Sequence, residues 1–337
     1  MSFRPTERQL ANLFLMVSLI VFAACSPTAW AQPAATMPKI GYLTAASRSS
    51  GSPGSQWDSV REKLREAGYI ESKNVVLEPR FADQRIERLP ELAADLVRRD
   101  VDVIITGGPS ATRAAKQATS RIPIVMLWDP DPVQAGFVAS LAQPGGNITG
   151  NSSVSPELIG KQDELLKAVV PRMSRVAFLG NSTEPGNVQT LKAAESAASA
   201  LGLQLVPLDA RVPSDVEPAL DVASKAGADG IVVPVTSSIF SAERRFMELV
   251  EKRRMPAMYY NMLFVLEGGL MAYAADPNDL SRRAVIYVDK ILKGAKASDL
   301  PIEMPAKFVL VVNLKAAKKI GLAFPSSVIA RADQVID

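Results

Sequence analysis

The amino-acid sequence predicts an α/β protein with two similar, Rossmann-like lobes, each built around a parallel β-sheet. Short apolar runs alternate with amphipathic helical stretches along the chain, which is the pattern of βαβ units. This pattern begins again after residue 150, although no obvious sequence repeat connects the two series. A chain of 337 residues also exceeds what one hydrophobic core usually supports, so two lobes are expected.

The first lobe is expected to contain five strands with helices between them. Trp57, Val60 and Leu64 recur at helical spacing, and Gly68 can end their helix. The run 101–106 is nearly all apolar, as a strand covered on both faces should be. Strands are predicted over residues 39–44, 75–81, 101–106, 124–127 and 148–150, and further helices over 89–97, 111–119 and 133–141.

The second lobe is expected to repeat this arrangement. Its strands are predicted over residues 176–179, 203–208, 230–235 and 256–259, and its helices over 188–200, 216–226 and 240–253. The final third adds a strand over 270–274, a helix that opens at Asp276-Pro277 and closes at Gly294, a strand over 308–312 and a helix over 314–320. These elements are too few for a third domain, so we expect them to complete the two lobes.

The expected domain boundaries follow from this order of elements. Residues 32–152 with about 270–297 form the first lobe, and residues 153–269 with about 298–337 form the second. The chain would then cross between the lobes more than once. Several crossing strands make a hinge, and closure of a hinge around a ligand is a common switching movement.

The N-terminus, residues 1–31, is predicted to be a cleaved signal peptide. Arg4 and Arg8 precede an apolar run over 10–24, and Ala29-Trp30-Ala31 offers a cleavage site. A membrane anchor is the alternative, but the apolar run is shorter than the roughly 20 residues that span a bilayer. Lipidation of Cys25 is a second alternative, although Phe22 stands where lipoprotein sites usually have leucine. We therefore expect a periplasmic protein.

The composition excludes several kinds of active site. The chain has no histidine, and its one cysteine, Cys25, lies in the segment expected to be removed. Ser-His-Asp triads, Cys-His pairs and zinc sites built on His or Cys therefore cannot form, and we expect no cofactor or metal. The net charge of +3 falls to +2 without Arg4, Glu7 and Arg8, and the absence of a basic stripe argues against nucleic acid. Carboxylate or lysine chemistry remains open.

The candidate ligand site lies beyond the carboxyl ends of the predicted strands, where open α/β sheets bind ligands. In the first lobe these ends include the pair Trp128 and Asp129. In the second lobe, the strand over 256–259 leads into Tyr260. The candidate ligand-binding residues are Thr44, Ser47, Gly107, Gly108, Asp129, Asn151, Asn181, Thr236 and Tyr260.

Four of these residues suggest a specific chemistry, each with a structural alternative. Gly107 and Gly108 let the backbone approach a ligand, and the amides of the following helix suit a carboxylate; they also suit a tight turn. Asp129 could hold an ammonium group, although aspartate before proline favours turns. Asp129 and Asp131 share one tight loop, which argues against an acid-base pair. The Tyr260 ring suits an aromatic or apolar group, or packing at the hinge.

A family resemblance covers essentially the whole chain after residue 31 and lies in the segments 40–43, 107–110, 144–150, 267–280, 287–295, 299–303, 313–322 and 330–337. The resemblance is to the ABC-transporter substrate-binding proteins that include tryptophan- and tyrosine-uptake proteins. It implies a type I periplasmic-binding fold with a three-strand hinge and an interlobe ligand. By position it also implies ligand contacts from Thr44, Gly108, Asp129, Asn151, Asn181 and Thr236. The family often has small residues where Trp128 stands and serine where Ala272 stands.

The resemblance implies a monomeric, non-catalytic importer subunit that passes a small molecule, such as an aromatic amino acid or related carboxylate, to an ABC permease and its ATPase. Two alternatives stay open. A ligand-sensing subunit of a membrane receptor would close in the same way. A carboxylate- or lysine-dependent hydrolase would instead turn its ligand over.

Overall fold

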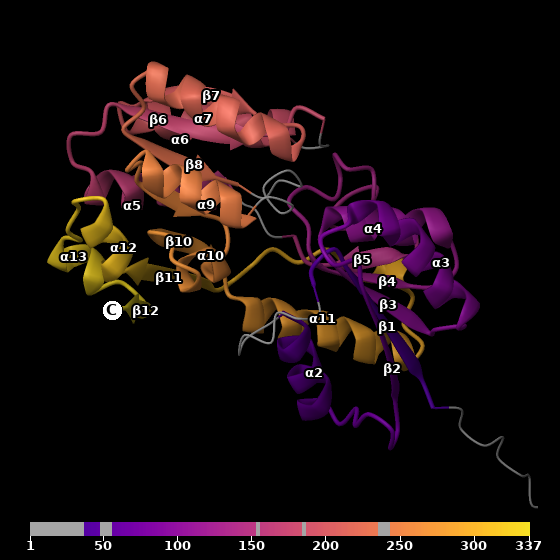
Figure 1. Ribbon diagram of the computed structural model, residues 1–337. Helices are drawn as coiled ribbons and strands as arrows, with labels where there is room; N and C mark the ends of the chain where they lie inside the picture. The colour runs from indigo at the N-terminus through magenta and orange to yellow at the C-terminus, as the bar shows by residue number, and fades with distance from the viewer. Residues whose placement is uncertain (1–36, 48–55, 153–155, 184–186, 235–242) are drawn as a thin grey trace, which may run out of the picture. The chain divides into compact units, whose positions relative to one another are not determined.

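The computed structural model describes residues 37–47, 56–152, 156–183, 187–234 and 243–337 (Figure 1). Residues 38–337 form one compact unit. The strands of this unit belong to two sheets, and helices cover both faces of each sheet. The α/β fold class predicted from the sequence is thus confirmed.

The first sheet has the strand order β2-β1-β3-β4-β5 and is entirely parallel. Alternating side chains reach opposite faces, as the twofold period of a strand requires. Leu43 and Ile104 pack with α3 (Leu89–Arg98) and α4 (Pro109–Ala118), while Tyr42 and Ile105 pack on the face of α2 (Gln56–Glu66) and α11 (Pro277–Leu292). The strands are β1 (Lys39–Thr44), β2 (Val76–Phe81), β3 (Val103–Gly107), β4 (Ile124–Trp128) and β5 (Ile148–Gly150).

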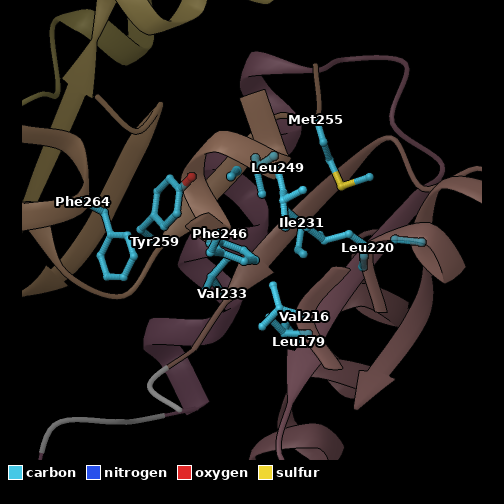
Figure 2. Packing of buried hydrophobic residues seen from close by; sticks show 14 of the residues in the cluster. Leu179, Val216, Leu220, Ile231, Val233, Phe246, Leu249, Met255, Tyr259 and Phe264 are labelled. Atoms are coloured by element: carbon cyan, nitrogen blue, oxygen red, sulfur yellow. The ribbon is translucent and has the colours of Figure 1, made fainter. Parts of the chain in front are cut away.

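The second sheet has the order β12-β11-β10-β9-β8-β6-β7, and only β10 and β11 pair antiparallel. Figure 2 shows one of its two cores, in which Phe246 and Tyr259 meet edge to face. The strands are β6 (Arg175–Gly180), β7 (Gln204–Asp209), β8 (Gly230–Val233), β9 (Ala257–Tyr259), β10 (Met271–Ala275), β11 (Phe308–Asn313) and β12 (Gln334–Ile336).

Two groups of helices cover this sheet. The core of Figure 2 lies under α7 (Val216–Lys225), α9 (Glu243–Lys252) and α10 (Met262–Leu266). The opposite core lies under α5 (Pro156–Val169), α6 (Asn187–Ala200), α12 (Leu314–Lys319) and α13 (Ser326–Ile329).

The chain returns to the first lobe, and leaves it again, later than the sequence suggested. The segment 271–275, expected in the first lobe, is β10 of the second sheet because it pairs with β9 and β11. Residues 298–303, expected in the second lobe, stay with the first: Thr149 Oγ1 donates to the Leu300 carbonyl at 2.8 Å, and the Glu303 amide donates to the Gly150 carbonyl at 3.0 Å. The returning segment is therefore 276–303, with α11 at its centre. The first crossing between the lobes follows β5, the second lies between β10 and α11, and the third follows residue 303.

Two helix predictions differ from the structure. The helix expected over 133–141 is a series of turns, in which the Phe137 and Val138 amides donate to the Pro132 carbonyl rather than four residues back. Phe137 and Val138 are nonetheless buried, which explains the apolar pattern. Conversely, α5 was not predicted, because the buried polar residues Gln162 and Asp163 interrupt its apolar stripe.

Candidate functional site

The candidate site is a pocket with about 730 Å³ of empty space, counting the part open to solvent. Ligand pockets are mostly apolar and carry a few polar groups. This pocket fits that description, since its described polar side chains are three amides, a threonine and a tyrosine. It is lined by Gln56, Trp128, Leu158, Ile159, Gln162, Thr190, Pro234, Tyr260, Asn261, Met262, Ala274, Ala275, Pro277 and Leu280.

The first-lobe wall of the pocket is formed by Trp128 and Gln56. Trp128 is the last residue of β4, and Gln56 is the first residue of α2. The indole Nε1–H of Trp128 donates to Gln56 Oε1 at 3.0 Å. Their hydrogen bond fixes the ring at the carboxyl end of the sheet, where the fold predicts ligands to bind.

The second-lobe wall combines helix α5 with the segment after β9. Gln162 of α5 is only 4% exposed, and its Nε2 donates to the Tyr273 carbonyl at 2.8 Å. Tyr260 packs edge to face on Phe264, with 5.3 Å between ring centroids. Asn261 caps α10, because its Oδ1 accepts the Leu263 amide at 3.0 Å. The amide side chains are thus held in place from behind.

The remaining wall belongs to the second crossing between the lobes. Ala274 and Ala275 end β10, and Pro277 and Leu280 begin α11. Asp276 caps this helix by accepting the Asn278 amide at 2.9 Å. Small alanine side chains here leave room that larger residues would fill.

The charged groups nearest this wall form a cluster on α11. Although burial opposes it, hydrogen bonds from Arg282 and Arg283 hold the pKa of the Asp279 carboxyl below its usual value. Arg283 also pairs with Glu303, whose Oε1 accepts the Tyr287 hydroxyl at 3.0 Å. The cluster therefore connects α11 with the start of the third crossing.

Three of the predicted site residues are buried at or next to the carboxyl ends of β1 and β3. Thr44 is buried, and its Oγ1 accepts the Ala46 amide at 3.2 Å. A Cβ atom added to Gly107 would lie 3.0 Å from that same oxygen. Gly108 is buried beneath the Trp128 ring. None of the three lines the pocket.

Asp129 and Asn151 are buried, and their hydrogen bonds connect elements of the fold. Asn151 Nδ2 donates to the Leu127 carbonyl at 3.1 Å and to the Leu280 carbonyl at 3.0 Å. The buried Asp129 accepts Ser152 Oγ at its backbone carbonyl, at 3.1 Å. These contacts join β4 to the first crossing and to α11.

The other predicted residues lie in different parts of the structure. Asn181 orders the loop after β6, since its Oδ1 accepts the Thr183 amide at 3.0 Å and the Thr183 hydroxyl at 2.7 Å. Ser47 is half-buried, and Thr236 lies outside the described residues. Among the predicted residues that the structure describes, Tyr260 alone lines the pocket. Gln56, Gln162 and Met262 also line the pocket, although nothing in the sequence marked them as site residues.

Within the described ranges, neither a cluster of metal-ligating side chains nor a membrane-spanning helix is present. No group of three or more His, Cys, Asp or Glu side chains there is arranged to hold a metal ion. Every helix there falls short of the length and apolarity that a membrane span requires.

Comparisons with known proteins agree with this architecture. The family model described as ABC transporter substrate binding protein matches residues 52–336. A curated tyrosine-binding protein of Clostridioides difficile (strain R20291) is 25% identical over 260 residues, which is 77% of this chain and 74% of that protein.

Solved structures give the same result. A Streptococcus pneumoniae protein described as an ABC domain in complex with L-Trp has a TM-score of 0.80 and 26% identity, and the match covers 89% of this chain and 99% of that one. A conserved domain protein from Vibrio cholerae has a TM-score of 0.79 and 25% identity over the same shares. Together with the family model, these likenesses show that the chain belongs to the ABC transporter substrate binding protein family.

Proposed function

We propose that this protein is the exported, non-catalytic component of an ABC importer and that it binds its ligand in the pocket between Trp128 and Tyr260. A solute-binding role in transport follows from membership of the family. The pocket supports the specific proposal, because residues of both lobes and of the second crossing line it. A ligand there would contact both lobes at once.

An aromatic amino acid or a related carboxylate is the proposed ligand class. Two aromatic rings and a largely aliphatic lining suit a ligand with a flat apolar body. Two relatives support this choice: one is named a tyrosine-binding protein, and the other was solved in complex with L-Trp.

Closure of the lobes would then follow from binding. A ligand shifts a conformational equilibrium only by its differential affinity for the two states. Contacts to both lobes exist only when the lobes close, so ligand should favour the closed form. Small-angle scattering should then show a smaller radius of gyration at saturation with L-tyrosine, whereas an unchanged radius would contradict closure.

We further propose where the protein acts and which membrane proteins it docks with. The signal peptide 1–31 would direct the protein to the periplasm, where it would act as a monomer and deliver ligand to an ABC permease and its ATPase. The pocket contains amides and hydroxyls but no charged side chain among its described lining residues, which supports binding without turnover. A receptor-linked sensor would use the same pocket, so the docking partner separates the two roles.

A thermal-shift screen against amino acids, sugars, nucleosides and small aromatic acids tests the binding role. A ligand that binds only the folded state stabilises it by about 2.7 kcal/mol at 100 times its dissociation constant. We expect aromatic amino acids to raise the melting temperature and sugars to leave it unchanged. The bound compound should be recovered intact after denaturation; its conversion to product would contradict the non-catalytic proposal.

A further inference from the structure

Trp128 occupies an unusual position for a pocket residue. Its ring packs against the first-lobe core that contains Tyr42 and Leu127, and it also lines the ligand pocket. The side chain is only partly buried. One part of the indole therefore packs against the core, and another part lines the pocket.

The first anchor is the turn at Gly108. A Cβ atom added to Gly108 would lie 2.7 Å from Cη2 and 2.9 Å from Cζ2 of Trp128, so the six-membered ring rests directly on this glycine. Gly108 has a φ of 100° and immediately precedes α4, in a conformation that side chains rarely adopt. The ring thus covers the turn that the sequence suggested as a ligand contact.

The second anchor is Gln56. Its Oε1 accepts the N–H of the five-membered ring at 3.0 Å. Burying an indole N–H without a partner would be costly, so this bond favours a single ring orientation. Packing of the six-membered ring against Gly108 and the hydrogen bond from Nε1 to Gln56 together leave the indole little freedom to turn.

We propose that Trp128 determines the ligand specificity of this protein by presenting a fixed aromatic surface to the flat, unsaturated part of the ligand. Gln56 and Gly108 are positioning residues that act through the indole. This inference rests on the proposed binding function. It goes further by assigning the discrimination between aromatic and aliphatic ligands to one side chain of the first lobe.

The test compares L-tyrosine with L-leucine, which share the same amino and carboxylate groups. Isothermal titration calorimetry gives the ratio of their dissociation constants for each variant. Trp128→Leu should reduce the preference for L-tyrosine about tenfold, the upper range for an aromatic pair. Gly108→Ala should reduce it similarly, because its new Cβ displaces the ring, and Gln56→Leu should reduce it less.

Gly68→Ala is the matched control for the glycine substitution. Gly68 also has a positive φ, 92°, but an added Cβ there meets nothing within 4 Å, and the residue does not line the pocket. It carries the same backbone strain without moving Trp128. Its ratio of dissociation constants should match that of the unmodified protein.

A fluorescence measurement tests the contact without altering the site. The chain has three tryptophans, so a variant with both Trp30→Phe and Trp57→Phe keeps Trp128 as the sole indole emitter. Saturation with L-phenylalanine, which does not absorb tryptophan excitation light, should shift or quench its emission. The same variant carrying Gly108→Ala should respond less.

The outcomes separate the two proposals. If the unmodified protein binds neither amino acid, the aromatic-ligand proposal fails and the role of Trp128 fails with it. If it binds L-tyrosine, but Trp128→Leu and Gly108→Ala keep the same preference and the emission of Trp128 does not respond, only the specificity role is overturned. A lowered preference in both variants, together with a fluorescence response, supports the role.

Discussion

Replacing Asp163 by asparagine should raise the free energy of unfolding by roughly 4 kcal/mol at about pH 8. Asp163 lies on α5 and is only 1% exposed. Within the described residues its Oδ2 has no hydrogen-bond partner. Burial raises the pKa of this carboxyl from 3.8 to about 7, so the folded protein holds a costly charge above neutral pH.

The sign of the pH dependence follows from the proton counts. Below pH 3.8 the carboxyl is protonated in the folded and unfolded chains, and it does not affect stability. Between pH 3.8 and about 7 the unfolded chain releases the proton while the folded chain keeps it, so stability falls as pH rises. Above this range both forms are ionised, and the loss is complete.

Urea denaturation at about pH 5 and about pH 8 measures this effect, since the linear extrapolation gives the free energy of unfolding at each pH. Asp163→Asn should gain much more stability at the higher pH than at the lower. Glu164→Gln is the matched control, because Glu164 is the next residue of α5 and its pKa is lowered by Lys161 rather than raised. Equal gains at both pH values would show that Asp163 is not protonated in the folded protein.

Asp163, whose buried charge lowers stability, lies next to residues that line the pocket. The preceding residue, Gln162, lines the pocket, and so does Ile159, one turn earlier on the same helix. Binding sites often contain groups that reduce stability, because selection acts on function there. Asp163 places such a group directly behind the second-lobe wall of the pocket.

The sequence predicted the sheets well because their strands are short and apolar. The strand over 39–44 has the same bounds as β1, and the helix between Pro277 and Gly294 corresponds to α11, with Tyr287 and Val288 buried as expected. The chain path between the lobes was harder, because pairing of β10 with β9 and β11 depends on the tertiary structure.

The pocket was only partly predictable for a related reason. The rule of strand ends led to the ends of β4 and β9, where Trp128 and Tyr260 lie. It also led to Thr44 and Gly107, the last residues of β1 and β3, and to Asp129, which follows β4. None of these three is among the described residues that line the pocket. Gln162 belongs to a helix whose buried polar residues concealed its periodicity. Strand ends therefore indicate a region, and packing decides which side chains line the pocket.

Replacing Gly150 by alanine should destabilise the protein by about 3–5 kcal/mol, by combining overpacking with backbone strain. Gly150 is the last residue of β5 and has a φ of 126°. An added Cβ would lie 2.5 Å from the backbone nitrogen of Met126 and even closer to its carbonyl oxygen. These are backbone atoms of the neighbouring strand β4, so no change of rotamer relieves the clash.

The consequences should extend to the hinge. The Gly150 carbonyl accepts the Glu303 amide at 3.0 Å, and the next residue, Asn151, donates to Leu127 and Leu280. Moving β5 away from β4 therefore strains the first and third crossings together. We expect L-tyrosine affinity to fall in Gly150→Ala along with the urea midpoint.

Gly68→Ala again provides the comparison, because its positive φ adds strain without any neighbour to clash with. Its cost should stay near 1–2 kcal/mol, roughly the value for an alanine at positive φ. The difference between the two variants measures the contact between β4 and β5. If both lose the same stability, the strands separate freely at this point, and Gly150 serves only the backbone conformation. A larger loss of stability in Gly150→Ala would show that the close approach of β5 to β4 stabilises the first crossing. Any side chain at position 150 would prevent that approach.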